Sequence, residues 1–316
     1  MKMRKIYLFT ILFVILGYSS FATTWNEPWH DEVIKNADSF VFARINSFDE
    51  RTGLDITIIR TISGNPIIGS INISSFYLLK ITSFSIKDFF EYFASNEAFF
   101  FIKQEINGNY SIATPTTGFA KVENGMVHAT YRHSYHQALV PIDIYEETIK
   151  AIFNNYHNQP YDNVYINEYI RKHLSRGPVN INTSSDLFFL QHVALECIFH
   201  LRLSGYYSEI IPFLNSSQNV HDQISAIRAL RAYNTDDCKN ELIKIINARG
   251  RNNFIQVMSI WTLSEFKPIE LKGKLIELLE NASTENNGFG GNLMDPRVGT
   301  YIPSVKIALQ NLIDLL

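Results

Sequence analysis

The residues most suited to chemistry in this sequence are three histidines in the run MVHATYRHSYH. Imidazole binds metals and titrates near neutral pH, so His128, His133 and His136 are candidates for a metal site or for acid–base catalysis. In a continuous strand, side chains alternate between faces, which puts His128 and His136 together and His133 opposite. If the chain becomes helical after Tyr131, His133 and His136 share a face instead. Neither geometry unites all three, and no Cys, Asp or Glu lies between them. We therefore expect no metal, no cofactor and no catalytic residue here.

The same run favours a second interpretation, in which its rings join two parts of the protein. Tyr131, His133, Tyr135 and His136 alternate aromatic and imidazole side chains where strand-like sequence gives way to helix-like sequence. Such amphipathic rings are typical of interfaces that are partly apolar and partly polar. We predict a polar-aromatic seam, in which His133, Tyr135 and His136 are candidate binding residues.

A second candidate site is the run NNGFGGNLMDPRVGTY, residues 286–301. Clustered glycines are typical of phosphate-binding loops, but no strand precedes this run and it contains no lysine. The composition therefore predicts a flexible insertion between helices, and such loops often carry contacts with other molecules. Phe289, Asp295 and Arg297 are the candidate partner-binding residues of this loop.

The two cysteines, Cys197 and Cys238, occupy apolar positions of predicted helices. We expect free core thiols and no disulfide, because a buried cysteine behaves as a small hydrophobic residue. His192 and His200 are interpreted as partly exposed helix residues, so no cysteine–histidine chemistry is predicted. Arg228 belongs to a modest basic cluster that we interpret as a solvated face.

The N-terminus has the pattern of a secretory signal peptide, residues 1–22. Three basic residues precede the apolar run Ile6 to Leu16, and Ser20 and Ala22 supply the small residues of a cleavage site after Ala22. The run is too short to span a bilayer. Its removal makes a chain of formal net charge −3 more acidic, which disfavours nucleic acid as a partner. We expect an exported protein, periplasmic or secreted, with no stable membrane insertion.

Residues 23–135 are predicted to form an antiparallel β-barrel of the OB type with one or two helices. Short apolar runs such as DSFVFARI and AFFFI are typical of buried strands. Asn107-Gly108 and Asn124-Gly125 lie between such runs, and Asn-Gly is a strong hairpin signal. The run SIKDFFEYFA has helical spacing. Residues 136–185 then change to helical spacing and are predicted to be bridging helices.

Residues 186–316 contain a repeat. Ile210, Leu242 and Leu275 occupy equivalent positions, separated by 32 and then 33 residues. The first helices of successive units read ALECIFHL, AIRALRAY and SIWTLSEF, with small residues in register. The fold class expected is therefore α+β with two domains, the second being an α-solenoid of about 3.5 helical hairpins.

Two resemblances follow from these patterns. The repeat region resembles short HEAT-like repeats, which implies an α-solenoid used for protein–protein contact. Residues 23–130 resemble the netrin-like, OB-fold class that includes metalloprotease inhibitors. Those inhibitors bind zinc through an N-terminal cysteine, and this chain has no cysteine before Cys197, which puts that mechanism in doubt.

The function expected is that of a non-enzymatic adaptor or scaffold that binds another protein through the solenoid. One alternative is a hydrolase or lyase with its site at the seam between barrel and solenoid, using His133, His136 and nearby tyrosines. Another is a carbohydrate-binding protein that uses exposed aromatic rings such as Trp25 and Trp29. A deep seam pocket with convergent polar groups favours the enzyme, and a filled seam beside an open groove favours the adaptor.

Overall fold

The computed structural model describes residues 25–49, 52–74, 96–114, 116–216, 219–248, 250–285 and 298–316. The predicted signal peptide, the predicted helix SIKDFFEYFA and the loop candidates Phe289, Asp295 and Arg297 lie outside these residues. Among the helices that are described, none combines the length and the apolar character needed to cross a membrane.

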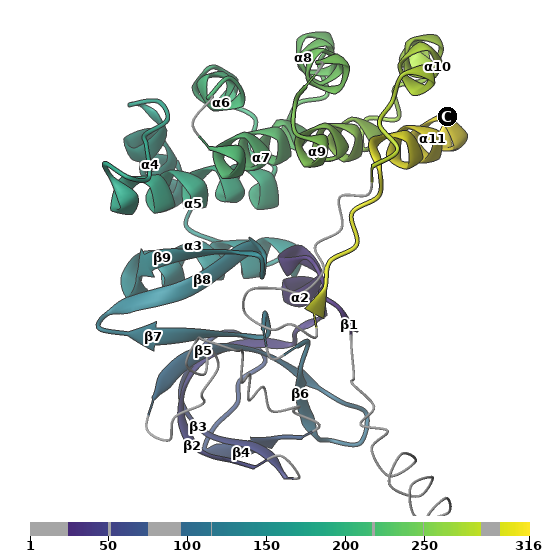
Figure 1. The fold of residues 1–316 in the computed structure, drawn as a ribbon. Coiled ribbons are helices and arrows are strands. Elements are labelled where there is room, and N and C mark those ends of the chain that lie inside the picture. Colours follow the sequence, from purple (N-terminus) through teal and green to yellow (C-terminus); the bar gives the residue numbers. More distant parts are fainter. Residues whose placement is uncertain are drawn as a thin grey trace, which may run out of the picture.

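Five strands form a closed barrel near the N-terminus, consistent with the predicted OB-like barrel. They are β2 (Ser39–Asp49), β3 (Gly53–Gly64), β4 (Ser70–Ile73), β5 (Glu97–Gln104) and β6 (Tyr110–Ile112). Their order is β2-β3-β4-β6-β5, and pairing of β2 with β5 closes the ring (Figure 1). The expectation of a wholly antiparallel barrel is wrong in one place, because β4 and β6 pair in parallel through Ile73 and Tyr110.

Three further strands continue the sheet from β5 towards the helices. They are β7 (Phe119–Glu123), β8 (Met126–His133) and β9 (His136–Pro141). Asn124 and Gly125 both have positive φ in the β7–β8 turn, which confirms that Asn-Gly hairpin. Residues 136–141, which we expected at the start of the helical segment, form a strand, because Ala138 and Val140 alternate with more exposed residues.

Strand β2 is apolar on both faces because each face meets a different core. Val41, Ala43 and Ile45 point into the barrel interior. Phe40 and Phe42 point outwards into a second core, which runs on through the helices. The barrel is therefore joined to the helical part by side chains of its own strands.

The helices lie in two rows above the sheet (Figure 1). Nearer the sheet are α5 (Ser185–Leu201), α7 (Val220–Ala229), α9 (Asn253–Ser264) and α11 (Val305–Leu315). Farther from it are α4 (Asn163–Leu174), α6 (Tyr207–Leu214), α8 (Asp236–Asn247) and α10 (Lys272–Glu280). The short helices α2 (His30–Asn36), η1 (Leu230–Ala232) and η2 (Ile269–Leu271) and the helix α3 (Ile142–Tyr156) complete the described set. The resemblance to HEAT-like repeats remains a prediction.

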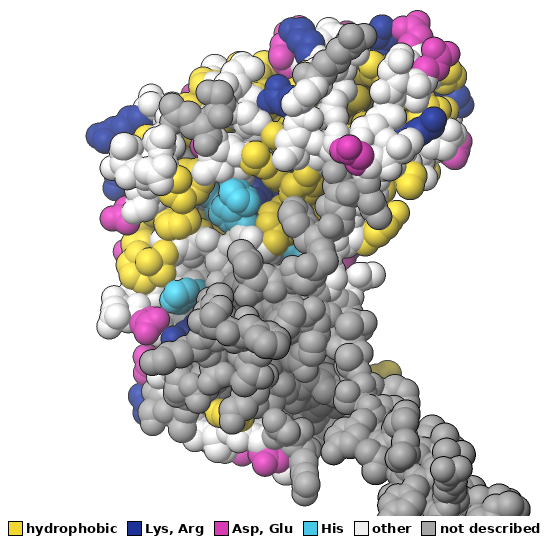
Figure 2. Space-filling view, in the orientation of Figure 1, with side chains coloured by type: hydrophobic (Ala, Val, Ile, Leu, Met, Phe, Trp, Pro, Cys, Tyr) yellow, Lys and Arg dark blue, Asp and Glu magenta, His cyan; other side chains and the backbone are white. Residues whose placement is uncertain are grey.

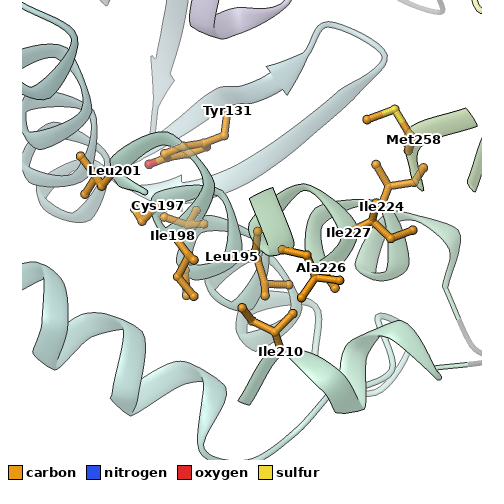
Figure 3. Close-up of a cluster of buried hydrophobic side chains, with 14 of the residues drawn as sticks. Tyr131, Leu195, Cys197, Ile198, Leu201, Ile210, Ile224, Ala226, Ile227 and Met258 are labelled. Carbon is orange, nitrogen blue, oxygen red and sulfur yellow. The ribbon is translucent and has the colours of Figure 1, made fainter. Parts of the chain in front are cut away.

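Side chains of several helices meet in one buried cluster beneath Tyr131 (Figure 3). The register residues Ile210, Leu242 and Leu275 are each fully buried. Cys197 and Cys238 are buried and free, and burial raises the pKa of both thiols. A short parallel pair, β1 (Trp25–Asn26) with β10 (Val298–Gly299), also ties the start of the described chain to the segment before α11.

Helix α3 makes a testable contribution to joining the barrel to the helices. Phe153 is fully buried and stacks on Phe40 of the barrel, with ring centroids 6.3 Å apart. Phe153→Ala is expected to lower the free energy of unfolding by about 3–5 kcal/mol, because it leaves a cavity at this joint. Val164→Ala, at a position 68% exposed, is the control and should change it by less than about 0.5 kcal/mol. Urea denaturation measures both, and equal effects would contradict a shared core.

Candidate functional site

The hairpin β8–β9 inserts the predicted seam residues between the sheet and the helices. His133 and His136 are paired across the hairpin. His133 is fully buried, and its Nε2 lies 3.2 Å from the carbonyl oxygen of Glu27. His128 instead lies at the surface beside Glu123, 3.4 Å away. The three histidines are therefore separated, and the described part of the chain contains no cluster that could hold a metal ion.

His136 meets two histidines that come from the helices. Its ring centroid is 4.3 Å from that of His192 on α5 and 4.3 Å from that of His221 on α7. The interpretation of His192 and His200 as partly exposed is wrong, since their exposed fractions are 2% and 1%. Helix α5 is covered by the sheet on one side and by α4 and α7 on the others, so it has little free face.

Arg132 places a full charge at the centre of this seam. Its side chain is fully buried. Its NH1 donates to Ser225 Oγ at 3.0 Å and to the carbonyl oxygen of His221 at 3.2 Å. Its NH2 lies 3.0 Å from Nδ1 of His221. The tip of a β-hairpin is thereby bonded to helix α7.

Glu196 of α5 supplies the opposite charge. It is fully buried, with Oε1 3.9 Å from NH1 of Arg132. Its Oε2 accepts a hydrogen bond of 3.0 Å from Nε of Arg228, and its Oε1 accepts one of 2.8 Å from Ser225 Oγ. We call Arg132, Glu196, Ser225 and Arg228 the seam network. Arg228 is only 5% exposed, so the predicted solvated face is wrong at this residue.

Ser225 and His192 have the look of a nucleophile and its base, with Oγ and Nδ1 2.9 Å apart. The serine hydroxyl, however, donates its proton to Glu196 and accepts from Arg132. The remaining lone pair of Ser225 Oγ accepts from Nδ1 of His192, so the neutral imidazole carries its proton on Nδ1. Since Ser225 is also fully buried, this group holds the fold together and is closed to a substrate.

Burial keeps the seam histidines neutral. It lowers the pKa of His133 and of His200 to about 4, and the pKa of His30 and of His221 to about 3. The pKa of His136 and the pKa of His192 are also lowered by burial and by neighbouring positive charge. Burial raises the pKa of the Asp222 carboxyl, against the effect of Arg132, to about 7. Histidine is visible among hydrophobic side chains on one face of the molecule, where the helices meet the sheet (Figure 2).

Sequence reasoning found the hairpin residues of this seam and missed the residues that hold them. A usable signal was present in ALECIFHL, where a lone carboxylate interrupts an apolar helix. A charge in such a position is buried only with a partner. The partner, Arg132, is 64 positions earlier in the chain, so local spacing did not indicate it.

An open groove lies at the far end of the helical array, away from the seam. It has a cavity volume of about 810 Å³ between the α8–α9 connection and helices α10 and α11. We call it the amide groove, because its lining includes five amide side chains: Asn247, Asn252, Asn253, Gln256 and Asn281. Unlike the seam residues, Asn247, Asn252 and Asn281 are exposed.

The seam network predicts a large effect of neutralising its carboxylate. Glu196→Gln leaves the guanidinium groups of Arg132 and Arg228 buried without a counter-charge, which should cost about 3–5 kcal/mol. Glu97→Gln, in the exposed pair with Arg44, is the matched control and should cost less than about 1 kcal/mol. Urea denaturation at pH 7 compares them. If the two variants lose equal stability, the network does not hold the seam.

The buried histidines predict loss of stability in mild acid. Their folded-state pKa values lie below the unfolded value, so the unfolded chain binds more protons between pH 6.5 and about 4. Stability should fall with pH across this window by about 1.4 kcal/mol per pH unit for each histidine. Asp222, with its raised pKa, opposes the trend as a single group.

The measurement is urea denaturation between pH 7 and pH 5. His221→Gln should flatten the dependence, whereas His128→Gln, at a surface position outside the seam, should leave it unchanged. A wild-type stability that is flat or rising towards pH 5 would contradict this account of the seam.

Comparison with known proteins supplies no relative for this arrangement. No family model, no curated protein and no solved structure matches the chain. The chemistry of both places, the buried seam and the open groove, is therefore argued from their own residues.

Proposed function

We propose that this chain is an exported, non-enzymatic protein that binds another protein through its helical array, used as a short HEAT-like solenoid. The observation that carries the proposal is the contrast between the two candidate places. The reactive groups of the seam are buried and bonded to one another, and the amide groove is open. Another protein can reach the open groove, whereas it cannot reach the buried groups of the seam. Export rests on the signal-peptide pattern of residues 1–22.

The amide groove has a framework that is formed before any partner binds. The Nδ2 of Asn253 donates to Ser283 Oγ at 3.1 Å, which ties the start of α9 to the segment after α10. The Nε2 of Gln256 donates to the carbonyl oxygen of Ile246 at 2.7 Å. These bonds hold the α8–α9 connection in place, so binding would not have to order it.

The exposed amides of the groove suit the main chain of a partner. An Asn side chain both donates and accepts, which matches the paired N–H and C=O groups of an extended peptide. Asn247 and Asn281 are exposed at opposite walls, at the end of α8 and after α10. We infer that the partner presents an extended segment to these amides.

Charge at the groove favours a basic partner segment. Glu277 and Glu285 are exposed lining residues. The cationic lining residue, Arg251, already donates to the carbonyl oxygen of Leu214 at 2.7 Å. Glu277 pairs with Lys274 at 2.8 Å and Glu285 accepts from Asn253 at 3.1 Å. Both carboxylates are exposed and keep further acceptor positions, which lysine or arginine in the segment would complement.

The alternative of a hydrolase or lyase at the seam lacks support from the geometry. Neither His133 nor His136 lines the amide groove, and both are buried. Tyr131 is fully buried with its hydroxyl 2.6 Å from Thr148 Oγ1.

The test is a peptide-display selection on the full chain without its predicted signal peptide. We expect enrichment of peptides with basic residues, and at least tenfold weaker binding of those peptides to the double variant Asn247→Ala/Asn281→Ala. Each lost hydrogen bond is worth roughly 0.5–1.5 kcal/mol, and tenfold corresponds to about 1.4 kcal/mol. Calorimetry measures the affinities.

Asn311→Ala is the matched control, since Asn311 is exposed on α11 and lies outside the groove lining. Its affinity for the selected peptides should equal that of the wild type. If no peptide is enriched, or if the double variant binds as tightly as the wild type, the groove is not the binding surface.

A further inference from the structure

A second cavity lies at the edge of the seam, between helix α2 and the helices α5, α7 and α9. Its volume is about 260 Å³, a little below the roughly 300–1,000 Å³ of sites for drug-sized ligands. Its lining includes Trp29, Asp31, Phe199, Arg228, Trp261 and Glu265. We call it the tryptophan pocket. Glu265 is exposed and Arg228 is buried, so the pocket runs from solvent towards the seam network.

Two indole rings form a corner of this pocket. Trp29 and Trp261 meet edge to face, with centroids 5.9 Å apart and planes at 87°. Both rings are half-buried, so each keeps surface that is not covered by protein. Such rings offer an apolar face to the C–H groups of a ligand.

The inner wall carries a hydrogen-bond donor with no acceptor. The Nε of Arg228 donates to Glu196, and the guanidinium group lies 3.7 Å from the ring centroid of Phe199. Its buried NH2 has no hydrogen-bond partner in the part of the chain that is described. A buried donor without a partner is costly, and Arg228 lines the pocket, so an acceptor that reached this nitrogen would gain a strong bond.

The charge of the lining decides which class of ligand fits. Asp31, Glu32 and Glu265 are carboxylates, and Arg228 and Arg231 are guanidinium groups. Asp31 already pairs with Lys35, and Glu265 already pairs with Arg231 and Arg202. A charged ligand would have to compete with these ion pairs, whereas a neutral ligand that both donates and accepts would not.

We propose that the tryptophan pocket binds one sugar ring. Its hydroxyl oxygens would accept from Arg228, its hydroxyl protons would be donated to Glu265 or Asp31, and its C–H face would lie on Trp29 or Trp261. This site is separate from the amide groove and does not depend on the proposed function. Its aromatic rings do not stand free on the surface, because Trp29 also packs on His133, with ring centroids 5.1 Å apart.

The test uses the intrinsic fluorescence of the full chain, in which two of the three tryptophans line the pocket. The probes are D-glucose, D-galactose, D-mannose and N-acetyl-D-glucosamine at millimolar concentrations, each beside its methyl glycoside. We expect a saturable change in emission with at least one sugar, confirmed by calorimetry. A free sugar that binds better than its glycoside assigns a free ligand, and the reverse assigns the end of a longer glycan.

Glu265→Ala should weaken binding at least tenfold. It also removes the ion pairs with Arg231 and Arg202, but pairs at such exposed positions contribute little, so thermal stability should change little. Glu280→Ala, at an exposed position of α10 outside the pocket, should bind as the wild type does. Acetate and tetramethylammonium are titrated as an anion and a cation. The proposal is overturned if either ion saturates the signal and no sugar does, if no probe does, or if Glu265→Ala binds sugar normally.

Discussion

The architecture depends on a buried charge cluster, in which Glu196 of α5 pairs with the guanidinium groups of Arg132 and Arg228. Arg132 stands at the end of a β-hairpin, and Glu196 and Arg228 stand on neighbouring helices, so three elements must meet for the whole cluster to form. Burying an uncompensated charge is far more costly than leaving a gap in an apolar core. The network therefore favours the placement of the sheet against the helices in which Arg132 reaches Glu196.

This constraint explains why the seam contains groups that resemble a catalytic site. Ser225 is hydrogen-bonded to both His192 and Glu196, and such bonds are what allow polar groups to be buried. The same burial lowers the pKa of the imidazoles, because the protein around them solvates a positive charge less well than water does. A chain whose stability is built on neutral histidines is sensitive to acid, and that sensitivity arises from the joint between sheet and helices rather than from either part alone.

The two open candidate sites lie at the rim of the molecule. The amide groove lies where the α8–α9 connection and helices α10 and α11 leave a gap, and the tryptophan pocket lies where α2 meets the array. Both cavities are lined in part by buried residues, whose positions are set by packing in the core. Arg228 belongs to both levels, since its Nε binds Glu196 inside the seam and its side chain also lines the pocket. A ligand at the pocket would thus contact the same side chain that locks the two parts together.

Local features of this fold were determined by the sequence itself. Asn124-Gly125 specifies a hairpin because both residues of that turn have positive φ. The apolar neighbours Phe40 and Val41 point to opposite faces of a strand, which therefore lies between two cores. The spacing of Ile210, Leu242 and Leu275 picks out three positions that are fully buried. Tertiary structure alone decided that His136 meets His192 and His221, that Arg132 finds Glu196, and that Trp29 faces Trp261. Those pairs are brought together by the docking of the sheet on the helices, whereas periodicity reports only which residues share a face of one element.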